Sequence, residues 1–170
     1  MDAAARRRAI AAALEKADGP VPASVLGERC GVSRQIIVGD IALLRAAGAE
    51  ITATPRGYVA GRGPAEGLRR TAACIHGFEG MERELNIMVD NGCTVLDVVI
   101  EHAVYGQLTG ELHLKSRRDV AEFMRRVREN AASPLSTLTG GIHTHTLLCP
   151  DEPAYEKTLT DLRTAGILLE

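Results

Sequence analysis

The sequence predicts an α+β protein built from two domains, and three observations support this prediction. Residues 1–62 show apolar side chains at helical spacing, whereas residues 68–170 alternate between strand-like and helix-like segments. The glycine-rich segment AGRGPAEG, residues 60–67, separates them. Charge divides there too, because residues 1–62 carry nine Lys/Arg against six Asp/Glu and the remaining residues carry eleven against sixteen. The two halves are therefore expected to bind different partners.

The composition excludes several classes of protein. Hydrophobic residues make up 45% and charged residues 25% of the chain, and no apolar run approaches the ~18 residues that span a bilayer. The start, MDAAARRRAI, lacks the apolar core and cleavage site of a signal peptide. We therefore expect a cytoplasmic protein that does not bind membranes. The four cysteines show no CxxC spacing, so we expect reduced, buried thiols rather than disulfides or a zinc ribbon.

The first domain begins with two predicted helices. Ile10 and Leu14 belong to an apolar stripe at helical spacing, and the segment DGP at residues 18–20 ends that helix. A short second helix is predicted at roughly residues 23–30. It ends at Gly31, which can take the left-handed conformation that a tight turn between helices needs.

A third helix and a hairpin complete this domain. Ser33 is a suitable N-cap for the helix RQIIVGDIALLRAAG. The residues of this helix that face its core are Ile37, Ile41 and Leu44. Those turned away from the core are Arg34, Gln35, Val38 and Arg45. The segment EITATPRGYVA alternates into two short strands with Arg56 at the tip. This arrangement predicts a winged helix-turn-helix that binds DNA through Ser33 to Gln35, Val38, Arg45 and Arg56.

Two points qualify that interpretation. A three-helix protein-interaction module with a basic, solvated face would show the same periodicity. Gly39 also weakens the third helix by up to ~1 kcal/mol relative to alanine. We interpret it as a site of close approach to the DNA backbone or to another helix.

The second domain alternates strands and helices in the order β-α-β-β-α-β-α. The predicted strands are residues 68–78, 93–106, 107–115 and 140–149, and the predicted helices are residues 79–92, 117–130 and 152–166. This order lacks the strict alternation of a parallel doubly wound fold. We therefore expect an α/β domain with a mostly antiparallel sheet and helices packed on one face.

Histidines in this domain are candidates for metal binding. His143 and His145 are two residues apart in a predicted strand, so their imidazoles share one face. His76 ends the first strand, and Glu84 follows eight residues later on a helix. If these two strands are neighbours, three imidazoles and a carboxylate converge in a set suited to zinc, nickel, iron or manganese. Strand histidines also often serve only as hydrogen-bond partners.

Long motifs in both domains carry a resemblance to a known family. They are VSRQIIVGDIALLRAAGAEITATPRGYV, IHGFEGMERELNIMVDNG, VVIEHAVYGQLTGEL, SRRDVAEFMRRV and PLSTLTGGIHTHTL. From about Arg6 to Ala165 the chain resembles the niacin-responsive transcriptional repressors of bacteria, which join a winged helix-turn-helix to a domain with three characteristic histidines. It departs from the family pattern at Ala103, where proline is usual, and at Gly39, where glutamine is usual.

The resemblance implies a ligand set and a function. The implied ligands of one divalent transition metal are His76, Glu84, His143 and His145. The implied effector is nicotinic acid, acting as co-repressor on genes of NAD biosynthesis or niacin uptake. A homodimer is expected, because one recognition helix reads too few base pairs for genomic selectivity.

Other residues and other functions remain open. His102 could line an effector pocket or satisfy a turn, and Tyr105 could stack on an aromatic effector or be structural. His113 is interpreted as a surface or packing residue. The alternatives are a metal-dependent hydrolase, a regulator with a different small-molecule effector, and a histidine phosphocarrier. No additional acid or base stands near the ligand motifs, which disfavours the hydrolase, and a paired His143 and His145 would be unusual for a single phosphoacceptor.

Overall fold

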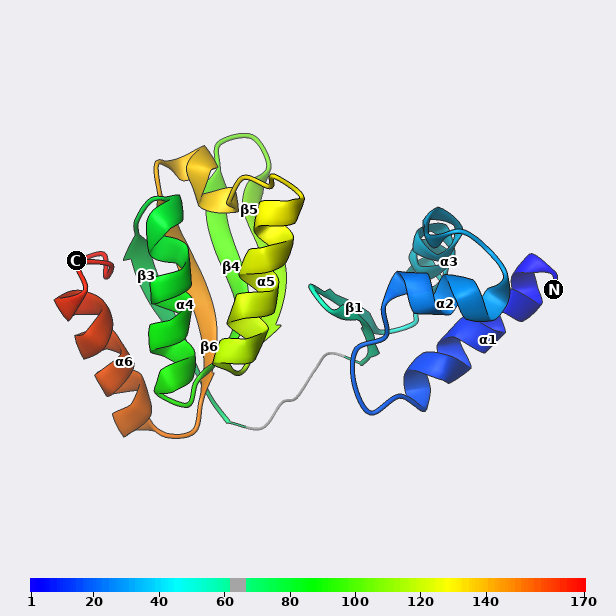
Figure 1. Ribbon diagram of the computed structural model, residues 1–170, viewed down its shortest axis with the longest axis horizontal. Coiled ribbons are helices and arrows are strands. Elements are labelled where there is room, and N and C mark those ends of the chain that lie inside the picture. Colours follow the sequence, from blue (N-terminus) through cyan, green and yellow to red (C-terminus); the bar gives the residue numbers. More distant parts are fainter. Residues whose placement is uncertain (62–66) are drawn as a thin grey trace. The chain divides into compact units, whose positions relative to one another are not determined.

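The computed structural model describes residues 1–61 and 67–170, which confirm the α+β class (Figure 1). The chain divides into two compact units, Met1–Ala65 and Glu66–Glu170, and each is described by itself. The predicted domain boundary falls on residues 62–66, which lie outside the described residues. Within the described ranges, no helix is both long and apolar enough to cross a membrane.

The first unit contains the predicted three helices and hairpin. Its elements are α1 (Ala3–Glu15), α2 (Ala23–Cys30), α3 (Arg34–Ala46), β1 (Ile51–Thr54) and β2 (Gly57–Ala60), the two strands being antiparallel. Ser33 caps α3, since its side chain accepts the N–H of Ile36 at 3.3 Å. Gly31 ends α2 with φ 66°, the left-handed conformation that the tight turn requires. The predicted caps and turn are confirmed.

A charged residue lies inside the core of this unit. The buried apolar residues are Ile10, Leu14, Val21, Ala23, Leu26, Ile37 and Ile41. Asp40 of α3 is only 3% exposed and accepts from Nε of Arg6, on α1, at 2.5 Å. The guanidinium of Arg7 lies 3.5 Å from the same carboxylate. These ion pairs fix α3 against α1.

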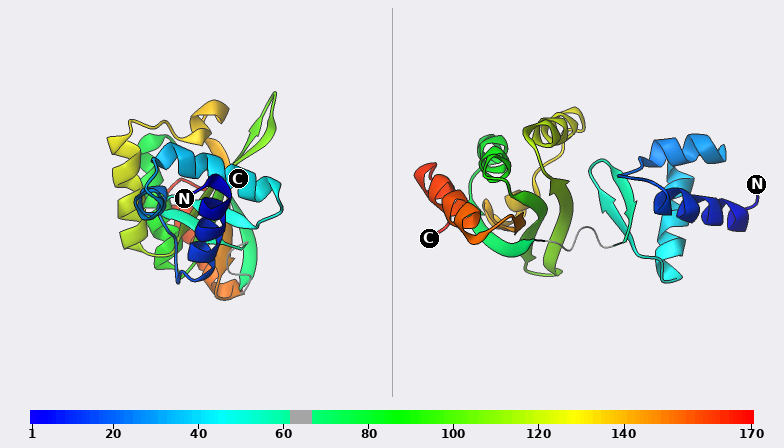
Figure 2. Two further views of the ribbon diagram at one scale, coloured as in Figure 1. Left: turned by 90° about the vertical axis from the view of Figure 1, so that its right-hand side faces the viewer. Right: turned by 90° about the horizontal axis from the view of Figure 1, so that it is seen from below.

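The second unit follows the predicted order, with two short 3₁₀ segments added. Its elements are β3 (Leu68–Ile75), η1 (Phe78–Gly80), α4 (Met81–Asp90), β4 (Thr94–His102), β5 (Gly106–Leu114), α5 (Arg117–Glu129), η2 (Leu135–Thr139), β6 (Ile142–Cys149) and α6 (Glu152–Thr164). The sheet order is β3-β6-β4-β5, and every neighbouring pair is antiparallel. Figures 1 and 2 show α4, α5 and α6 on one face of this sheet.

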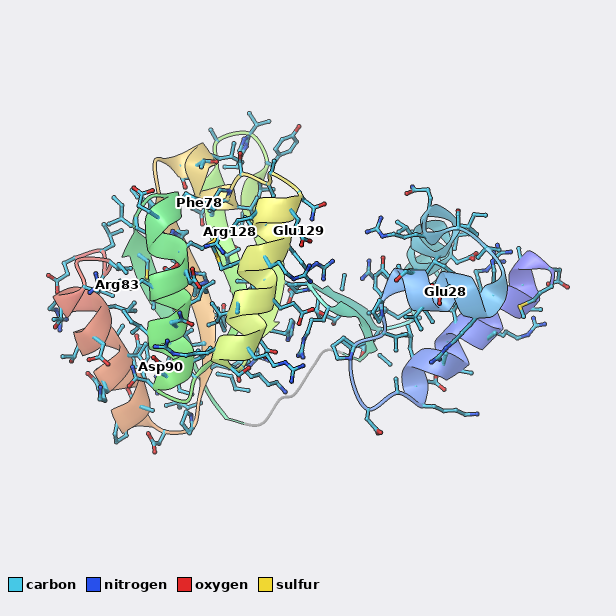
Figure 3. All side chains as sticks on the ribbon, in the orientation of Figure 1. Glu28, Phe78, Arg83, Asp90, Arg128 and Glu129 are labelled. Carbon is cyan, nitrogen blue, oxygen red and sulfur yellow. The ribbon has the colours of Figure 1, made fainter. Side chains whose placement is uncertain are left out.

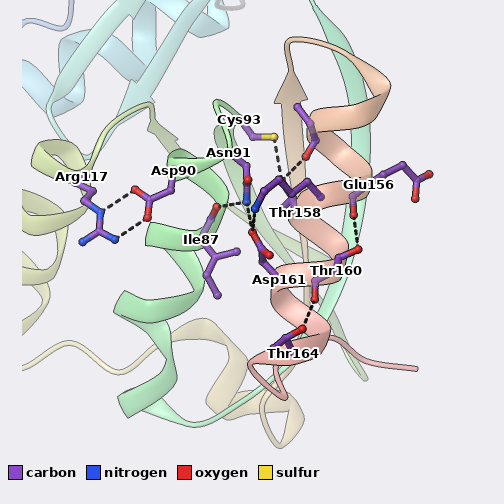
Figure 4. A network of polar contacts seen from close by, with 12 residues as sticks. Ile87, Asp90, Asn91, Cys93, Arg117, Glu156, Thr158, Thr160, Asp161 and Thr164 are labelled. Carbon is purple, nitrogen blue, oxygen red and sulfur yellow. Dashed lines mark hydrogen bonds and ion pairs between the residues drawn. The ribbon is translucent and has the colours of Figure 1, made fainter.

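Side chains from the sheet and the helices form one core between these layers. It includes Leu85 and Met88 of α4, Val120 of α5 and Leu162 of α6. The C-terminal half of α6 is joined to the end of α4 by a polar contact, in which Asn91 Nδ2 donates to Asp161 Oδ2 at 3.0 Å (Figure 4). The core therefore holds β6, the central strand, rigidly against α4.

Candidate metal centre and nucleic-acid interface

The four predicted metal ligands lie together. His76 follows β3, Glu84 projects from α4, and His143 and His145 project from β6, which pairs directly with β3. The Nε2 atoms of His76 and His143 lie 2.6 and 2.7 Å from the carboxylate oxygens of Glu84. The Nε2 atom of His145 lies 3.2 Å from Oε1 of the same carboxylate. Three of these side chains are almost fully buried, Glu84 being 1% exposed and the two β6 histidines 3% each.

Backbone carbonyls orient all three imidazoles in the same way. The Nδ1 atoms of His76, His143 and His145 lie 2.7, 2.8 and 2.7 Å from the carbonyl oxygens of Gly77, Gly141 and Asp97. A carbonyl oxygen only accepts, so each Nδ1 carries the proton. In a neutral imidazole the lone pair is then on Nε2, facing the carboxylate. Acceptors facing acceptors repel, so this cluster requires protons or a metal cation at its centre.

The Nε2 atom of His145 shows whether the cluster fits a metal ion. It is buried and has no hydrogen-bond partner, although it lies 3.2 Å from a Glu84 oxygen. The distance is short but the direction is wrong for a hydrogen bond, and an orphaned buried nitrogen is costly. A ligand atom aimed at a shared ion has this arrangement. Three imidazoles and one carboxylate are a donor set for zinc, nickel, iron or manganese, so the residues fit such an ion.

The cluster is also strongly coupled electrostatically. Burial alone would raise the pKa of Glu84, but the charge of His145 and hydrogen bonds from the imidazoles hold that pKa well below 4.5. Burial alone would lower the pKa of His76 and of His145, but the Glu84 carboxylate outweighs burial and raises both above 6.5. Metal-free protein therefore favours protonation of His76 and His145 beside an ionised Glu84 carboxylate.

Cys74 also lies beside the candidate metal ligands, and the sequence analysis did not predict this. It pairs with His143 in the β3–β6 register, and ligand atoms of Cys74, Glu84 and His143 all lie within 4.8 Å of one another. Burial and the neighbouring carboxylate raise the pKa of its thiol. We expected only a packing role for this residue. Its position two residues before His76, on the inward face of the same strand, was the available signal.

A cavity of about 290 Å³ opens beside the candidate ligands. Its wall is mainly apolar and is formed by the sheet, α4, α5 and the segment before η2. Phe123 of α5 and Ser136 of η2 line it, together with Glu111 of β5. The sequence analysis identified neither Phe123 nor Ser136 as part of a site. Glu111 of β5 borders the cavity through its position in the strand, but its side chain alternates to the other face of the sheet, where it pairs with His113 at 2.7 Å.

The structure does not bring the two predicted effector residues to this cavity. His102 and Tyr105 lie at the β4–β5 turn and are not among the residues that line the cavity. The Nδ1 atom of His102 accepts the backbone N–H groups of Val104 and Tyr105 at 3.1 Å each. Tyr105 is 74% exposed. The geometry within one chain therefore favours the turn interpretation of His102, and Tyr105 stands away from the cavity.

The predicted DNA-reading residues occupy different environments. Arg34 and Gln35 are exposed in the first turn of α3, whereas Val38 is half-buried. Arg45 braces the hairpin, because its Nε donates to the carbonyl of Ile51 at 2.9 Å and its guanidinium lies 5.9 Å from the ring centre of Tyr58. Arg56 stands in the hairpin turn, between β1 and β2. The start of α3 and the hairpin tip are therefore the best-placed surfaces for DNA.

Gly39 has no packing explanation inside its own unit. It is exposed in the middle of α3, and a Cβ atom built there would meet nothing within 4 Å. Ile36 and Leu43, one turn to either side, are 43% and 55% exposed. Nothing in the described unit therefore accounts for the glycine.

The fold joins a helix-turn-helix type of module to an antiparallel-sheet domain that contains a candidate metal centre. Family comparison agrees, because an HTH domain matches residues 6–59 and a 3H domain matches residues 69–170. The chain is 41% identical over 165 residues to the "Probable transcription repressor NiaR" of Thermotoga maritima, which covers 97% of this chain and 94% of that protein.

Two further relatives were found. One is the "Transcription repressor NadR" of Bacillus subtilis, 41% identical over 160 residues, which cover 92% of this chain and 89% of that protein. An uncharacterized protein of Methanothermus fervidus is 25% identical over 100 residues, 55% of this chain and 16% of its own length. The chain belongs to the niacin-responsive transcriptional repressor family, as its motifs indicated. It is a transcription repressor and not an enzyme.

Proposed function

We propose that this repressor uses a metal ion and nicotinic acid as co-repressor to control genes of NAD biosynthesis or niacin uptake. The observation that carries the proposal is the position of the ligand cluster in the wall of an apolar cavity. Nicotinic acid combines a flat aromatic ring with a carboxylate and a pyridine nitrogen. The cavity offers an apolar space for the ring and, at one end, donors for a cation.

The lining of the cavity makes the cation important for an anionic effector. At about 290 Å³, the cavity is at the lower end of the ~300–1,000 Å³ typical of small-molecule sites. No lysine or arginine is among its lining residues, and Glu84 is the carboxylate that faces the imidazoles. When the imidazoles are neutral, a carboxylate entering this space would meet the negative charge of Glu84 and no positive protein charge. A metal held by the cluster would supply the missing positive charge, so metal loading and effector binding are expected to be coupled.

The four candidate ligands would approach that ion from three different elements. His143 and His145 provide two nitrogen donors from one rigid strand, while His76 and Glu84 approach from β3 and α4. Nickel, zinc, iron or manganese bound there would act as a Lewis acid toward a carboxylate or pyridine nitrogen. The backbone carbonyls at Nδ1 keep all three rings oriented and make Nε2 the donor.

The active species in this proposal is a homodimer on a two-fold operator. Arg34 and Gln35 would read base edges, since they are exposed at the start of α3. Arg56, on the hairpin, would contact the phosphate backbone. Arg34→Ala and Gln35→Ala should reduce discrimination between operator and random DNA, whereas Arg56→Ala should mainly lower affinity and flatten its salt dependence. Arg29→Ala, on exposed α2, is the matched arginine control.

The deciding experiment is a titration of an operator fragment at fixed salt with metal-loaded full-length protein. Nicotinic acid should tighten binding by ~5- to 150-fold, the usual range of allosteric coupling. Nicotinamide, which lacks the carboxylate, should act more weakly, and NAD and biotin are tested in parallel. Removing the metal should abolish the gain more than it lowers basal binding. If no pyridine compound changes the affinity, the niacin assignment fails and a different effector must be sought.

The cavity can be tested in the same assay. Phe123→Leu keeps an apolar side chain but removes the aromatic ring that lines the cavity, so it should weaken the nicotinic acid response. Tyr105→Leu makes the same kind of change at the exposed β4–β5 turn. A response lost in the Tyr105 variant and kept in the Phe123 variant would contradict the assignment of the effector to this cavity.

A further inference from the structure

One face of the sheet in the second unit is left uncovered by that unit's own elements. The helices α4, α5 and α6 pack on the opposite face (Figure 2). The strand register defines which side chains share the uncovered face. His143 and His145 point toward the helices, so Thr144 points away from them. Its partners in the neighbouring strands, Ala73 and Val99, belong to the same outer row.

The composition of this outer face is unusual for a surface in contact with water. The outward residues of the central strand β6 are Ile142, Thr144, Thr146 and Leu148. None is charged, although the solvated face of an antiparallel sheet is normally polar. Ile142 and its partner Ile75 are 46% and 38% exposed. The outer sides of the helices differ, since they carry charged residues such as Arg83 and Asp90 (Figure 3).

Charged side chains on this face lie near its margins and are opposite in sign. Arg69 is exposed on β3, one edge of the sheet, and Glu111 is exposed on β5, the other edge. Glu101 of β4 lies at the opposite end of the strands from Arg69 and accepts from the side chain of Gln107 at 2.9 Å. Asp97 is the acid nearest the middle within the four strands, and its Oδ1 accepts the backbone N–H of Thr146 at 2.9 Å. That carboxylate is thus engaged with the backbone of β6.

We propose that this outer face is the dimer interface, stacked sheet to sheet on the same face of a second copy of the chain. The inference rests on the homodimer of the proposed function. A two-fold axis parallel to the strands places β3 of one copy over β5 of the other. Arg69 and the Glu111 side chain of the partner sheet then lie about one two-residue step apart along the strands, so this ion pair can form twice, once at each side. The uncharged centres of the two faces meet between these margins.

The size of the face is sufficient for this role. Four strands spaced ~4.8 Å apart and about eight residues long at ~3.3 Å per residue cover roughly 500 Å². Two such faces bury roughly 1,000 Å² in total, the lower bound for a specific interface. The β4–β5 hairpin adds to this area. It extends beyond the sheet in Figure 2, and Val104 and Tyr105 at its turn are 80% and 74% exposed. In the dimer, this hairpin reaches toward the partner subunit.

A charge placed at the centre of the face tests the proposal. In Thr144→Arg the new guanidinium points away from the metal-ligand side of β6, and stacking would bury it without a partner. The dimer Kd should rise roughly 100-fold or more. Thr109→Arg makes the same change on the edge strand β5, where the side chain is already exposed and folding is least at risk. Thr160→Arg, on the exposed side of α6, is the matched control and should leave the Kd unchanged.

Sedimentation equilibrium on full-length, metal-loaded protein measures these constants, and metal content with circular dichroism shows that each variant is folded. A charge exchange then tests the orientation. Arg69→Glu and Glu111→Arg should each weaken the dimer, and the double variant should recover at least tenfold of the loss.

The possible results distinguish failure of the proposed interface from failure of the homodimer. If the wild type is a dimer, and Thr144→Arg and Thr109→Arg retain its Kd, the interface lies elsewhere and the inference is wrong while the homodimer stands. The dimer Kd would also be unchanged in both variants if this face contacted the DNA-binding module instead of a second copy. If the wild type is monomeric at micromolar concentration with metal, effector and operator, the homodimer is wrong and the interface falls with it. The nicotinic acid titration tests the effector separately, because it compares the operator affinity of one protein with and without the compound.

Discussion

Each unit of the molecule buries a carboxylate on a helix, and the two carboxylates are neutralised in different ways. Asp40 of α3 is 3% exposed and faces the guanidinium groups of Arg6 and Arg7. Glu84 of α4 is 1% exposed and faces three imidazoles. A guanidinium is charged at every physiological pH, whereas an imidazole is charged only when it is protonated.

The Asp40 cluster is therefore a structural ion pair, whereas the Glu84 cluster needs an external cation. The Asp40 pair is complete in the chain itself, so it holds the recognition helix under all ordinary conditions. The Glu84 cluster is complete only when protons or a metal ion enter it. The first unit therefore has a constant structure for reading DNA, while the second can exist in two states with different charge. An effector can act only on a unit that has such alternative states.

The largest expected effect is complete loss of metal from the histidine cluster. His143→Ala combined with His145→Ala removes two donors from the same strand, and elemental analysis should show no stoichiometric metal. His76→Ala should also lose the ion. The first unit should unfold as in the wild type, because it contains none of these residues. His113→Ala removes a histidine outside the cluster and should retain the metal. Full metal occupancy in the double variant would remove this site from consideration.

The second effect is a loss of stability confined to the first unit. Asp40→Ala leaves the charge of Arg6 unpaired in a site where that side chain is 15% exposed, which should cost about 3 kcal/mol of unfolding free energy. Scanning calorimetry of the full chain should show a lower Tm for the DNA-binding module and unchanged metal content. Asp18→Ala, an exposed aspartate in the same unit, is the control. A change below about 0.5 kcal/mol would contradict the role given to the ion pair.

The third effect is a dependence on pH that reverses when metal binds. In metal-free protein the pKa of His76 and of His145 is raised above 6.5, so their contribution is present below that pH and is lost as pH rises. The pKa of Glu84 is lowered below 4.5, so its contribution is present above that pH and is lost in acid. The metal-free second unit should thus be most stable between about pH 4.5 and 6.5 and lose stability toward pH 8.

Metal should change the sign of this trend, because protons compete with the ion for the Nε2 atoms. Melting temperatures of the second unit at pH 6 and pH 8, with metal and with a chelator, measure both trends. The first unit should show neither, since arginine does not titrate in this range. Parallel trends with and without metal would show that the histidines are not the ligands.

The smallest effect concerns Gly39. Gly39→Ala should raise the stability of the first unit by up to ~1 kcal/mol, because alanine favours the helix and a Cβ has free space there. Operator binding should weaken if DNA approaches this glycine closely, as its exposed position on α3 suggests. Gly19→Ala also has free space for a Cβ but lies outside the helices, so it serves as the control for DNA binding. Unchanged operator affinity in Gly39→Ala would mean that the DNA does not approach at this point.

Periodicity and local turn chemistry were sufficient to predict most of the fold. The predicted second helix has the bounds of α2, and the predicted N-cap at Ser33 is present. Both depend only on neighbouring residues. The convergence of His76 with His143 followed from a single condition, that β3 and β6 are neighbours, and the structure meets it.

What sequence could not provide depends on packing between distant elements. The cavity wall combines Phe123 of α5 with Ser136 of η2, and no local pattern relates these positions. Asp40 was missed for a different reason, because a charged residue inside an apolar stripe has a partner that only the tertiary structure reveals. The hydrogen bonds of His102 join it to the backbone two and three residues later. Because these contacts are local, the role of His102 in the turn could be predicted from the sequence.

The position of β6 in the sheet has a consequence for how the protein is made. This strand is the last of the four in the chain, yet it lies in the interior of the sheet between β3 and β4. During synthesis His76 and Glu84 leave the ribosome long before His143 and His145, and β3 has no partner strand within its sheet until β6 arrives. Such distant pairings form slowly. The candidate metal site is therefore assembled at the end of folding, and an ion bound there would report that nearly the whole domain has been completed.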